Sequence, residues 1–192
     1  MSGAGVGADA GLQRLVAWGQ ARAPRRALDV AGGGHTALAF AAVAPQVIAV
    51  DVEAELTAAR RILGRAAHNV RLVAGDVAAL PFDNGAFDLV TCRLAAHRFP
   101  HAALAVREIQ RVLAPGGSLL LAEPLAHDDN HRDAVTAGVL SPRTPLPLRA
   151  YRRPEWHAFL RAAGLTTMEE DTIVTAAGTP ADFMILLRAE KD

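Results

Sequence analysis

Cysteine is scarce in this sequence of 192 residues, and long apolar runs and an excess of either charge are missing from it. Cys92 is the only cysteine, so an internal disulfide and a cysteine-rich metal site are excluded. The apolar stretch 37–44 is far shorter than the ~20 residues that cross a bilayer. The N-terminus has no basic segment followed by an apolar core. We therefore expect a cytoplasmic protein with no membrane insertion.

The charges cancel, because 20 basic and 20 acidic residues give a formal net charge of zero. Such a chain lacks the overall positive field that attracts nucleic acid or an anionic membrane. Its 51% hydrophobic and 21% charged residues are typical of a globular domain with a sizeable core. We expect one domain over 1–192, with 1–11 disordered, that acts on a small molecule and binds no nucleic acid.

Short, apolar, β-rich segments alternate with helical patterns. The predicted strands are 26–31, 46–51, 70–76, 87–92 and 118–123, and the helices between them are 35–44, 53–66 and 101–113. This alternation indicates parallel crossovers. With two further strands at 166–174 and 182–189, the sequence predicts an α/β fold: a Rossmann-like, doubly wound, mostly parallel seven-stranded sheet with helices on both faces.

The segments outside this alternation have weaker patterns. A helix is predicted over 12–22, and another over 153–165, with Pro154 near its start and Gly164 at its end. Residues 124–150 are rich in proline, histidine and aspartate. They are predicted to form a long lid or substrate loop with one helix near 131–140.

A glycine-rich turn joins the first predicted strand to its helix in "ALDVAGGGHTALAFAA", residues 27–42. Such a turn lets a ligand lie against bare backbone at a helix N-terminus. Polar residues follow the neighbouring strands: Asp51 after the second, Asp76 after the third, and Arg93 and His97 after the fourth. In open α/β sheets ligands bind beyond the carboxyl ends of the strands, so we expect these side chains to face one crevice.

Four segments in order carry a family resemblance: "LDVAGGGHTALAFA", "VIAVDVEAEL", "VRLVAGDVAALPFDNGAFDLVTCRLAAHRF" and "REIQRVLAPGGSLLLAEP". They resemble the motifs of class I S-adenosylmethionine-dependent methyltransferases, in the branch typified by the ubiquinone and menaquinone methyltransferases. Ala31 stands at the usual first glycine of the family motif, and His35 at the third. Alanine is small, and His35 would crowd a dinucleotide pyrophosphate, which favours a sulfonium cofactor.

The resemblance implies which residues hold S-adenosylmethionine. The turn of Ala31, Gly32 and Gly33 would hold its methionine end, and Asp29 would help to place its amino group through water. Asp51, with the adjacent Val52, would bind the ribose hydroxyls. Asp76 and the backbone of Val77 would hold the adenine, and Arg93 completes the set of cofactor-binding residues.

The implied reaction is direct in-line methyl transfer to a small-molecule acceptor. A general base is needed only if the acceptor arrives protonated. His97 is the candidate, because imidazole titrates near neutral pH; packing or helix capping is the alternative role. His127 and His131 could bind a metal if helical, but nothing nearby completes a ligand set, so we expect no metal.

Two other functions stay open at this stage. One is a non-catalytic S-adenosylmethionine-binding or scaffold protein with the same fold. The other is an NAD-dependent dehydrogenase, whose catalytic residue would have to be Tyr151 or Lys191. For a methyltransferase the pocket must be closed to water. We expect closure by 124–150, by a second copy of the chain in a homodimer, or by the substrate itself.

Overall fold

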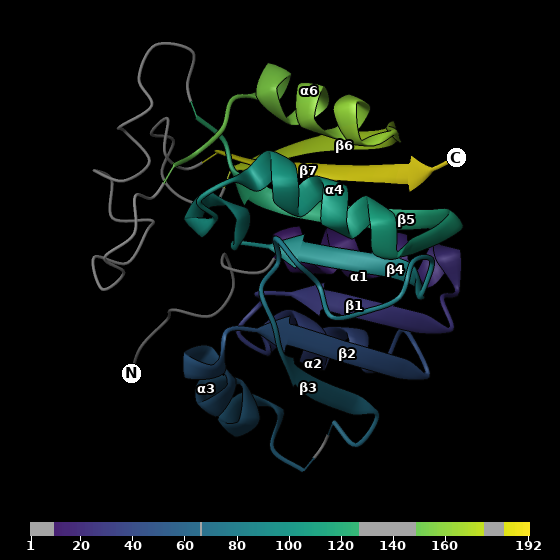
Figure 1. Cartoon of the computed structure of the whole chain (residues 1–192), viewed down its shortest axis with the longest axis vertical. Coiled ribbons are helices and arrows are strands. Elements are labelled where there is room, and N and C mark those ends of the chain that lie inside the picture. The colour runs from purple at the N-terminus through teal and green to yellow at the C-terminus, as the bar shows by residue number, and fades with distance from the viewer. Residues whose placement is uncertain (1–9, 66, 127–148, 175–182) are drawn as a thin grey trace.

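The computed structural model describes residues 10–65, 67–126, 149–174 and 183–192. Within them seven strands form one sheet in the order β3-β2-β1-β4-β5-β7-β6 (Figure 1). The strands are β1 (Arg26–Val30), β2 (Gln46–Asp51), β3 (Val70–Ala74), β4 (Phe87–Arg93), β5 (Leu113–Pro124), β6 (Leu165–Val174) and β7 (Phe183–Lys191). Strands β1 to β5 pair in parallel, whereas β7 is antiparallel to both β5 and β6. The predicted mostly parallel, doubly wound sheet is confirmed.

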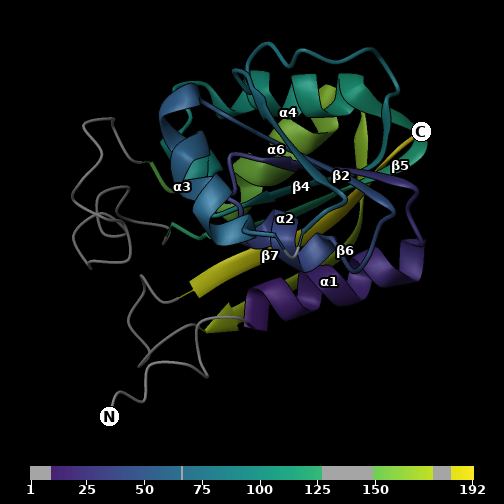
Figure 2. The same cartoon turned by 90° about the horizontal axis from the view of Figure 1, so that it is seen from below.

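Helices cover both faces of the sheet (Figure 2). The helices are α1 (Ala10–Arg22), α2 (His35–Phe40), α3 (Glu53–Leu63), the 3-10 helix η1 (Ala96–Arg98), α4 (Ala102–Val112) and α6 (Arg153–Ala163). Helices α1 and α2 lie behind the sheet in Figure 1, and α4 and α6 lie in front of it. The layers follow from the parallel connections, each of which must cross one face of the sheet.

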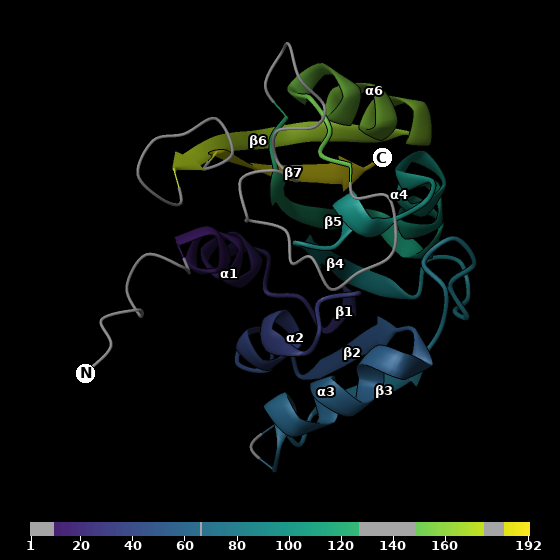
Figure 3. The same ribbon diagram turned by 90° about the vertical axis from the view of Figure 1, so that its left-hand side faces the viewer.

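The sheet has a separate apolar core on each of its two faces. One contains Trp156 and Leu160 of α6 together with α4, and the other contains Leu15 and Trp18 of α1 with Phe40 of α2. The strands between them are buried on both faces, which is why their sequences are nearly continuous apolar runs. The carboxyl ends of β1, β2 and β4 meet at one edge, on the left of Figure 1 and facing the viewer in Figure 3.

Some boundaries differ from the predicted ones. Helix α1 begins at Ala10, two residues before the predicted start, so Ala10 and Gly11 are helical although they fall in the segment predicted to be disordered. Helix α2 ends at Phe40 and is shorter than the predicted 35–44. Strand β5 begins at Leu113 rather than at 118, because Leu113 pairs with Phe87 before the register shifts. Residues 1–9, most of the predicted lid 124–150 and its helix near 131–140 lie outside the described residues.

Candidate functional site

The turn between β1 and α2 uses backbone conformations that most residues avoid. Ala31, Gly33 and Gly34 have φ values of 53°, 62° and 92°, in the left-handed region where a Cβ is strained. The N–H of Ala31 donates to the carbonyl of Val50 at 2.8 Å, which ties the turn to the end of β2. The predicted glycine turn therefore lies at the carboxyl edge of the sheet.

Asp29 lies behind this turn. Its carboxylate is 1% exposed and accepts hydrogen bonds from Thr91 Oγ1 at 2.8 Å and from the N–H of Ala37 at 3.1 Å. A Cβ at Gly32 would overlap the Asp29 carboxylate, so glycine is required there. Burial raises the pKa of Asp29 to about 7, although both hydrogen bonds oppose the rise.

A cavity of about 280 Å³ opens beside the turn. Four segments form its walls: the end of β1 with the turn, the end of β2 with the start of α3, the residues after β3, and η1 with the residues after it. The lining residues are Val30, Ala31, Val50, Asp51, Val52, Glu55, Gly75, Asp76, Val77, Arg98, Phe99 and Pro100. Of the predicted site residues, the structure thus brings Ala31, Asp51, Val52, Asp76 and Val77 together.

Asp51 contributes a buried carboxylate to this wall. It is 9% exposed, and its Oδ1 accepts a hydrogen bond from the N–H of Val52 at 2.9 Å. Its buried Oδ2 has no hydrogen-bond partner of normal geometry among the described residues, although the N–H of Gly33 is near enough to contribute a small lowering of the pKa. Burial raises the pKa of Asp51 above its ordinary range, and the charge of Arg98 is one of the effects that oppose the rise.

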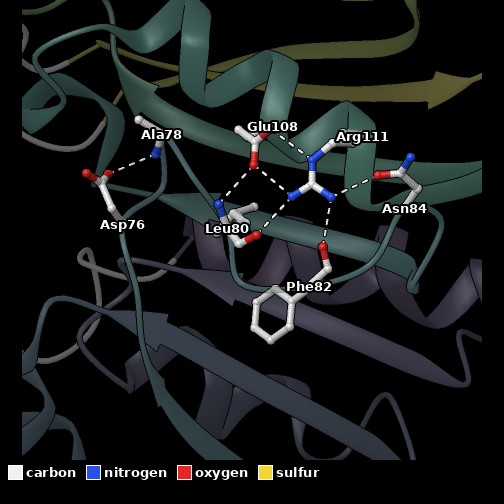
Figure 4. Close-up of polar contacts among 7 residues, drawn as sticks. All are labelled: Asp76, Ala78, Leu80, Phe82, Asn84, Glu108 and Arg111. Atoms are coloured by element: carbon white, nitrogen blue, oxygen red, sulfur yellow. Dashed lines mark hydrogen bonds and ion pairs between the residues drawn. The ribbon is translucent and has the colours of Figure 1, made fainter.

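Asp76 lines the cavity two residues beyond the end of β3. Its side chain is exposed, and its Oδ1 accepts a hydrogen bond from the N–H of Ala78 at 2.8 Å (Figure 4). This local bond holds the carboxylate at the start of a turn, a habit of aspartate that follows a strand. Both Asp76 and Val77 therefore face the cavity from a short ordered turn.

The other predicted residues lie outside the cavity wall. Asp29 and Gly32 lie against one another behind the glycine turn, whereas a Cβ at Gly33 would meet open space. Arg93 ends β4 and is half-buried, and its positive charge opposes the rise in the pKa of Asp29. His97 is in η1 and is only 6% exposed.

His97 is bonded to a carboxylate that the sequence analysis missed. Its Nδ1 lies 2.9 Å from Oε2 of Glu123, which is fully buried at the end of β5. The same carboxylate accepts the backbone N–H groups of Ala95, Ala96 and His97 at 2.7, 2.8 and 3.3 Å. Glu123 therefore fixes the path of the chain from β4 into η1. Its position at the end of a predicted strand was a signal that could have identified it.

Arg98 was also missed, although it follows His97 directly. It lines the cavity, and its Nη2 donates to the carbonyl of Ala31 at 2.9 Å. The side chain thus connects η1 to the glycine turn across the cavity edge. Its role depends on how η1 is turned, which no local pattern specifies.

No group of three or more His, Cys, Asp or Glu side chains within the described ranges could hold a metal ion. His127 and His131 lie outside those ranges. No described helix is long and apolar enough to cross a membrane.

Known proteins share this arrangement. Residues 28–121 match the methyltransferase domain family. The chain is 35% identical over 188 residues to the uncharacterized methyltransferase YcgJ of Bacillus subtilis, covering 92% of this chain and 74% of YcgJ. The crystal structure of YcgJ superposes with a TM-score of 0.78 and 26% identity, over 94% of this chain and 97% of that one. The chain belongs to the class I S-adenosylmethionine-dependent methyltransferases.

More distant methyltransferases resemble parts of the chain or its fold. The demethylmenaquinone methyltransferase of Deinococcus radiodurans is 38% identical over 123 residues, which cover 62% of this chain and 51% of that protein. The N-methyltransferase NodS of Bradyrhizobium japonicum, solved with S-adenosylhomocysteine, has a TM-score of 0.70 at 16% identity, over 95% of this chain and 85% of NodS. The second likeness shows the fold alone.

The structure does not place either candidate catalytic residue of a dehydrogenase, Tyr151 or Lys191, in the cavity wall. Tyr151 is only 5% exposed, and Lys191 Nζ donates to the carbonyls of Gln110 and Leu113 at 3.0 and 2.7 Å. Neither residue lines the described cavity. The family that the sequence resembled is confirmed.

Proposed function

We propose that this methyltransferase binds S-adenosylmethionine in the cavity beside the glycine turn and methylates a small-molecule acceptor. The observation that carries the proposal is Oδ2 of Asp51, a buried carboxylate oxygen in the cavity wall with no hydrogen-bond partner of normal geometry in the described ranges. A buried acceptor without a donor is unfavourable. A ribose hydroxyl would supply the missing donor.

The rest of the wall fits the other parts of the cofactor. The carboxylate of Asp76 can accept a hydrogen bond from the exocyclic amine of an adenine, and the N–H of Val77 can donate one to a nitrogen of the adenine ring. On the other side, the turn of Ala31, Gly32 and Gly33 offers bare backbone to the methionine end. Asp29, Val52 and Arg93 are proposed to support this set from behind or beside it.

The bound cofactor supplies a methyl group on a sulfonium, which is already an activated leaving group. The protein's own residues therefore have to align the acceptor and keep water away. If the acceptor carries a proton on the attacking atom, a base must take it. His97 is proposed for this step, because its imidazole lies where the chain passes from β4 into η1 and is oriented by Glu123.

A small acceptor is supported by the absence of net charge, since a nucleic-acid substrate favours a basic surface. The match to a demethylmenaquinone methyltransferase suggests quinone-like acceptors, but the chain spans about half of that protein. Phenols, quinone precursors and small amines are therefore the acceptors to screen for formation of S-adenosylhomocysteine.

The test of the cofactor site is the replacement Asp51→Ala. It leaves ribose hydroxyls without an acceptor in a mostly buried site. We expect the dissociation constant for S-adenosylmethionine to rise roughly ten- to a hundredfold, a loss on the order of 1–3 kcal/mol. Isothermal titration calorimetry measures the change directly.

The matched control is Glu53→Ala. Glu53 is an exposed acidic residue in the first turn of α3, two positions from Asp51, and it does not line the cavity. Its replacement should leave the dissociation constant within about twofold. Equal affinity for Asp51→Ala and the wild-type protein would remove the ribose assignment.

A further inference from the structure

An ion pair on α4 holds the loop that follows the cavity wall. Glu108 and Arg111 are three positions apart on this helix. Nε of Arg111 donates to Oε1 of Glu108 at 2.9 Å, and Nη2 donates to Oε2 at 2.8 Å (Figure 4). These two parallel bonds orient the guanidinium plane, as expected for an arginine–carboxylate fork.

The same two side chains also bind the backbone of residues 80–84, which we name the clamped loop. The N–H of Leu80 donates to Glu108 Oε2 at 2.9 Å, and Arg111 Nη2 donates to the carbonyl of Leu80 at 2.9 Å. Arg111 Nη1 donates to the carbonyl of Phe82 at 2.8 Å and to Oδ1 of Asn84 at 2.9 Å. Both backbone polar groups of Leu80 are therefore bonded to one ion pair.

The clamped loop continues from the residues that line the cavity. Asp76 and Val77 are wall residues. The turn that follows them is closed by the bond from Ala78 N–H to Asp76 Oδ1 at 2.8 Å and by that from Ala79 N–H to the Asp76 carbonyl at 3.0 Å. Leu80 comes next, and its side chain is buried in the core. A shift of Leu80 would therefore move the wall through a short, internally bonded turn.

Another part of the cavity wall is attached to the same helix. Phe99 and Pro100 line the cavity and lead directly into α4. The helix is anchored in the core through Ala105, Ile109 and Val112. Helix α4 is thus continuous in sequence with the wall residues Phe99 and Pro100. Through Glu108 and Arg111 it is also hydrogen-bonded to the loop that follows the other wall residues.

We propose that the Glu108–Arg111 pair is a positioning element that sets the width of the cavity on its adenine side. It contributes to cofactor affinity and adenine selectivity without touching the cofactor. The inference rests on the proposed cofactor site. As an ion pair alone, Glu108 and Arg111 would add little to the free energy of unfolding, because both side chains are partly exposed, Arg111 by 30% and Glu108 by 22%.

The experiment compares Arg111→Met, Glu108→Gln and the double variant with the wild-type protein. The probes are S-adenosylhomocysteine and S-inosylhomocysteine, in which oxygen replaces the adenine amino group. We expect each single variant to raise the dissociation constant for S-adenosylhomocysteine roughly fivefold or more and to reduce the preference over the inosine analogue. The double variant should lose little more than either single one, because the two residues act as a unit.

The matched control is Glu155→Gln on α6. Glu155 also pairs with an arginine three positions away, Arg152 at 3.3 Å, and does not line the cavity. This variant should keep both dissociation constants within about twofold. Arg111→Lys, which keeps the charge and loses the fork, should show a smaller loss and serves if Arg111→Met does not fold.

Three outcomes contradict the proposals in different ways. Folded Glu108 and Arg111 variants with wild-type affinity would overturn the positioning role alone. So would equal loss of affinity for both probes, because a general loosening does not discriminate adenine from its analogue. A wild-type protein that binds neither probe would overturn the cofactor site, and the positioning role with it.

Discussion

Asp29 shows how a single carboxyl shapes the site from behind it. It is almost fully buried, and the glycine at position 32 leaves room for its oxygens. Its two hydrogen bonds do not compensate for desolvation, so its pKa is raised to about 7. Between about pH 4 and pH 7 the native state therefore holds a proton that the unfolded chain, with an ordinary carboxyl pKa near 3.9, releases.

The first prediction is a pH effect on stability that belongs to Asp29. Because the folded pKa is the higher one, its contribution is fully present below about pH 4 and is lost as the pH rises to about 7. The expected loss approaches roughly 1.4 kcal/mol per pH unit within this window. Asp29→Asn has no carboxyl to titrate, so its unfolding free energy should lack this slope relative to the wild-type protein.

Urea denaturation at a series of pH values between 4 and 8 measures the difference. Asp83→Asn is the control, because Asp83 is exposed, and it should keep the wild-type pH dependence. If Asp29→Asn and the wild-type protein lose stability in parallel across this range, the raised pKa of Asp29 is wrong.

At the scale of elements, the junction of β4, η1 and β5 depends on one buried carboxylate. Glu123 at the end of β5 accepts three backbone N–H groups at the start of η1 and lies against His97 Nδ1. Buried polar groups of this kind are stable only when they are all paired. The junction therefore holds His97 in one orientation, as a proposed general base requires.

The second prediction separates the two roles of His97. If it removes a proton from the acceptor, His97→Ala should lower turnover by ~10²-fold while the dissociation constant for S-adenosylmethionine stays within about twofold. We expect this result with an acceptor that is protonated at the attacking oxygen or nitrogen. Steady-state kinetics and calorimetry on the same preparation measure both quantities. Full turnover with a lowered melting temperature would instead assign His97 to packing against Glu123.

On the scale of the whole molecule, the last strand, β7, contributes side chains to both apolar cores. Strand β7 lies between β5 and β6 and pairs with both. Ile185, Leu187 and Ala189 belong to the core under α4 and α6, whereas Met184 and Leu186 belong to the core under α1. The strand thus connects both apolar layers, and its loss would expose each of them.

The third prediction is that Leu187→Ala destabilises the protein as a whole. The side chain is 1% exposed, so truncation leaves a cavity and should lower the unfolding free energy by about 2–5 kcal/mol. Met168→Ala on β6, where the side chain is 50% exposed, should change it by less than about 0.5 kcal/mol. Chemical denaturation followed by circular dichroism gives both values.

Cooperativity is measured in the same experiment by tryptophan fluorescence. Trp156 and Trp18 lie in the two different apolar cores, so together they report on both layers. Fluorescence and circular dichroism should give one coincident transition for Leu187→Ala. Separate transitions would show that β7 does not couple the layers.

The amino-acid sequence by itself determined the alternating α/β architecture, the glycine turn and the aspartates at the strand ends. These features are local: burial on both faces makes strands apolar, and a turn that needs positive φ selects glycine. For that reason Asp51, Asp76 and Val77 could be placed in the cavity wall before the structure was known. The family was identified from the same local motifs.

Only the tertiary structure decided the contacts between distant segments. The insertion of β7 between β5 and β6, the bond from Arg98 to the carbonyl of Ala31, and the pairing of Glu123 with His97 have no local signal. The hydrogen bonds from Glu108 and Arg111 to residues 80–84 likewise have no local signal in the sequence. Each depends on how packed elements turn their side chains toward one another, and a pattern along one segment does not contain that direction.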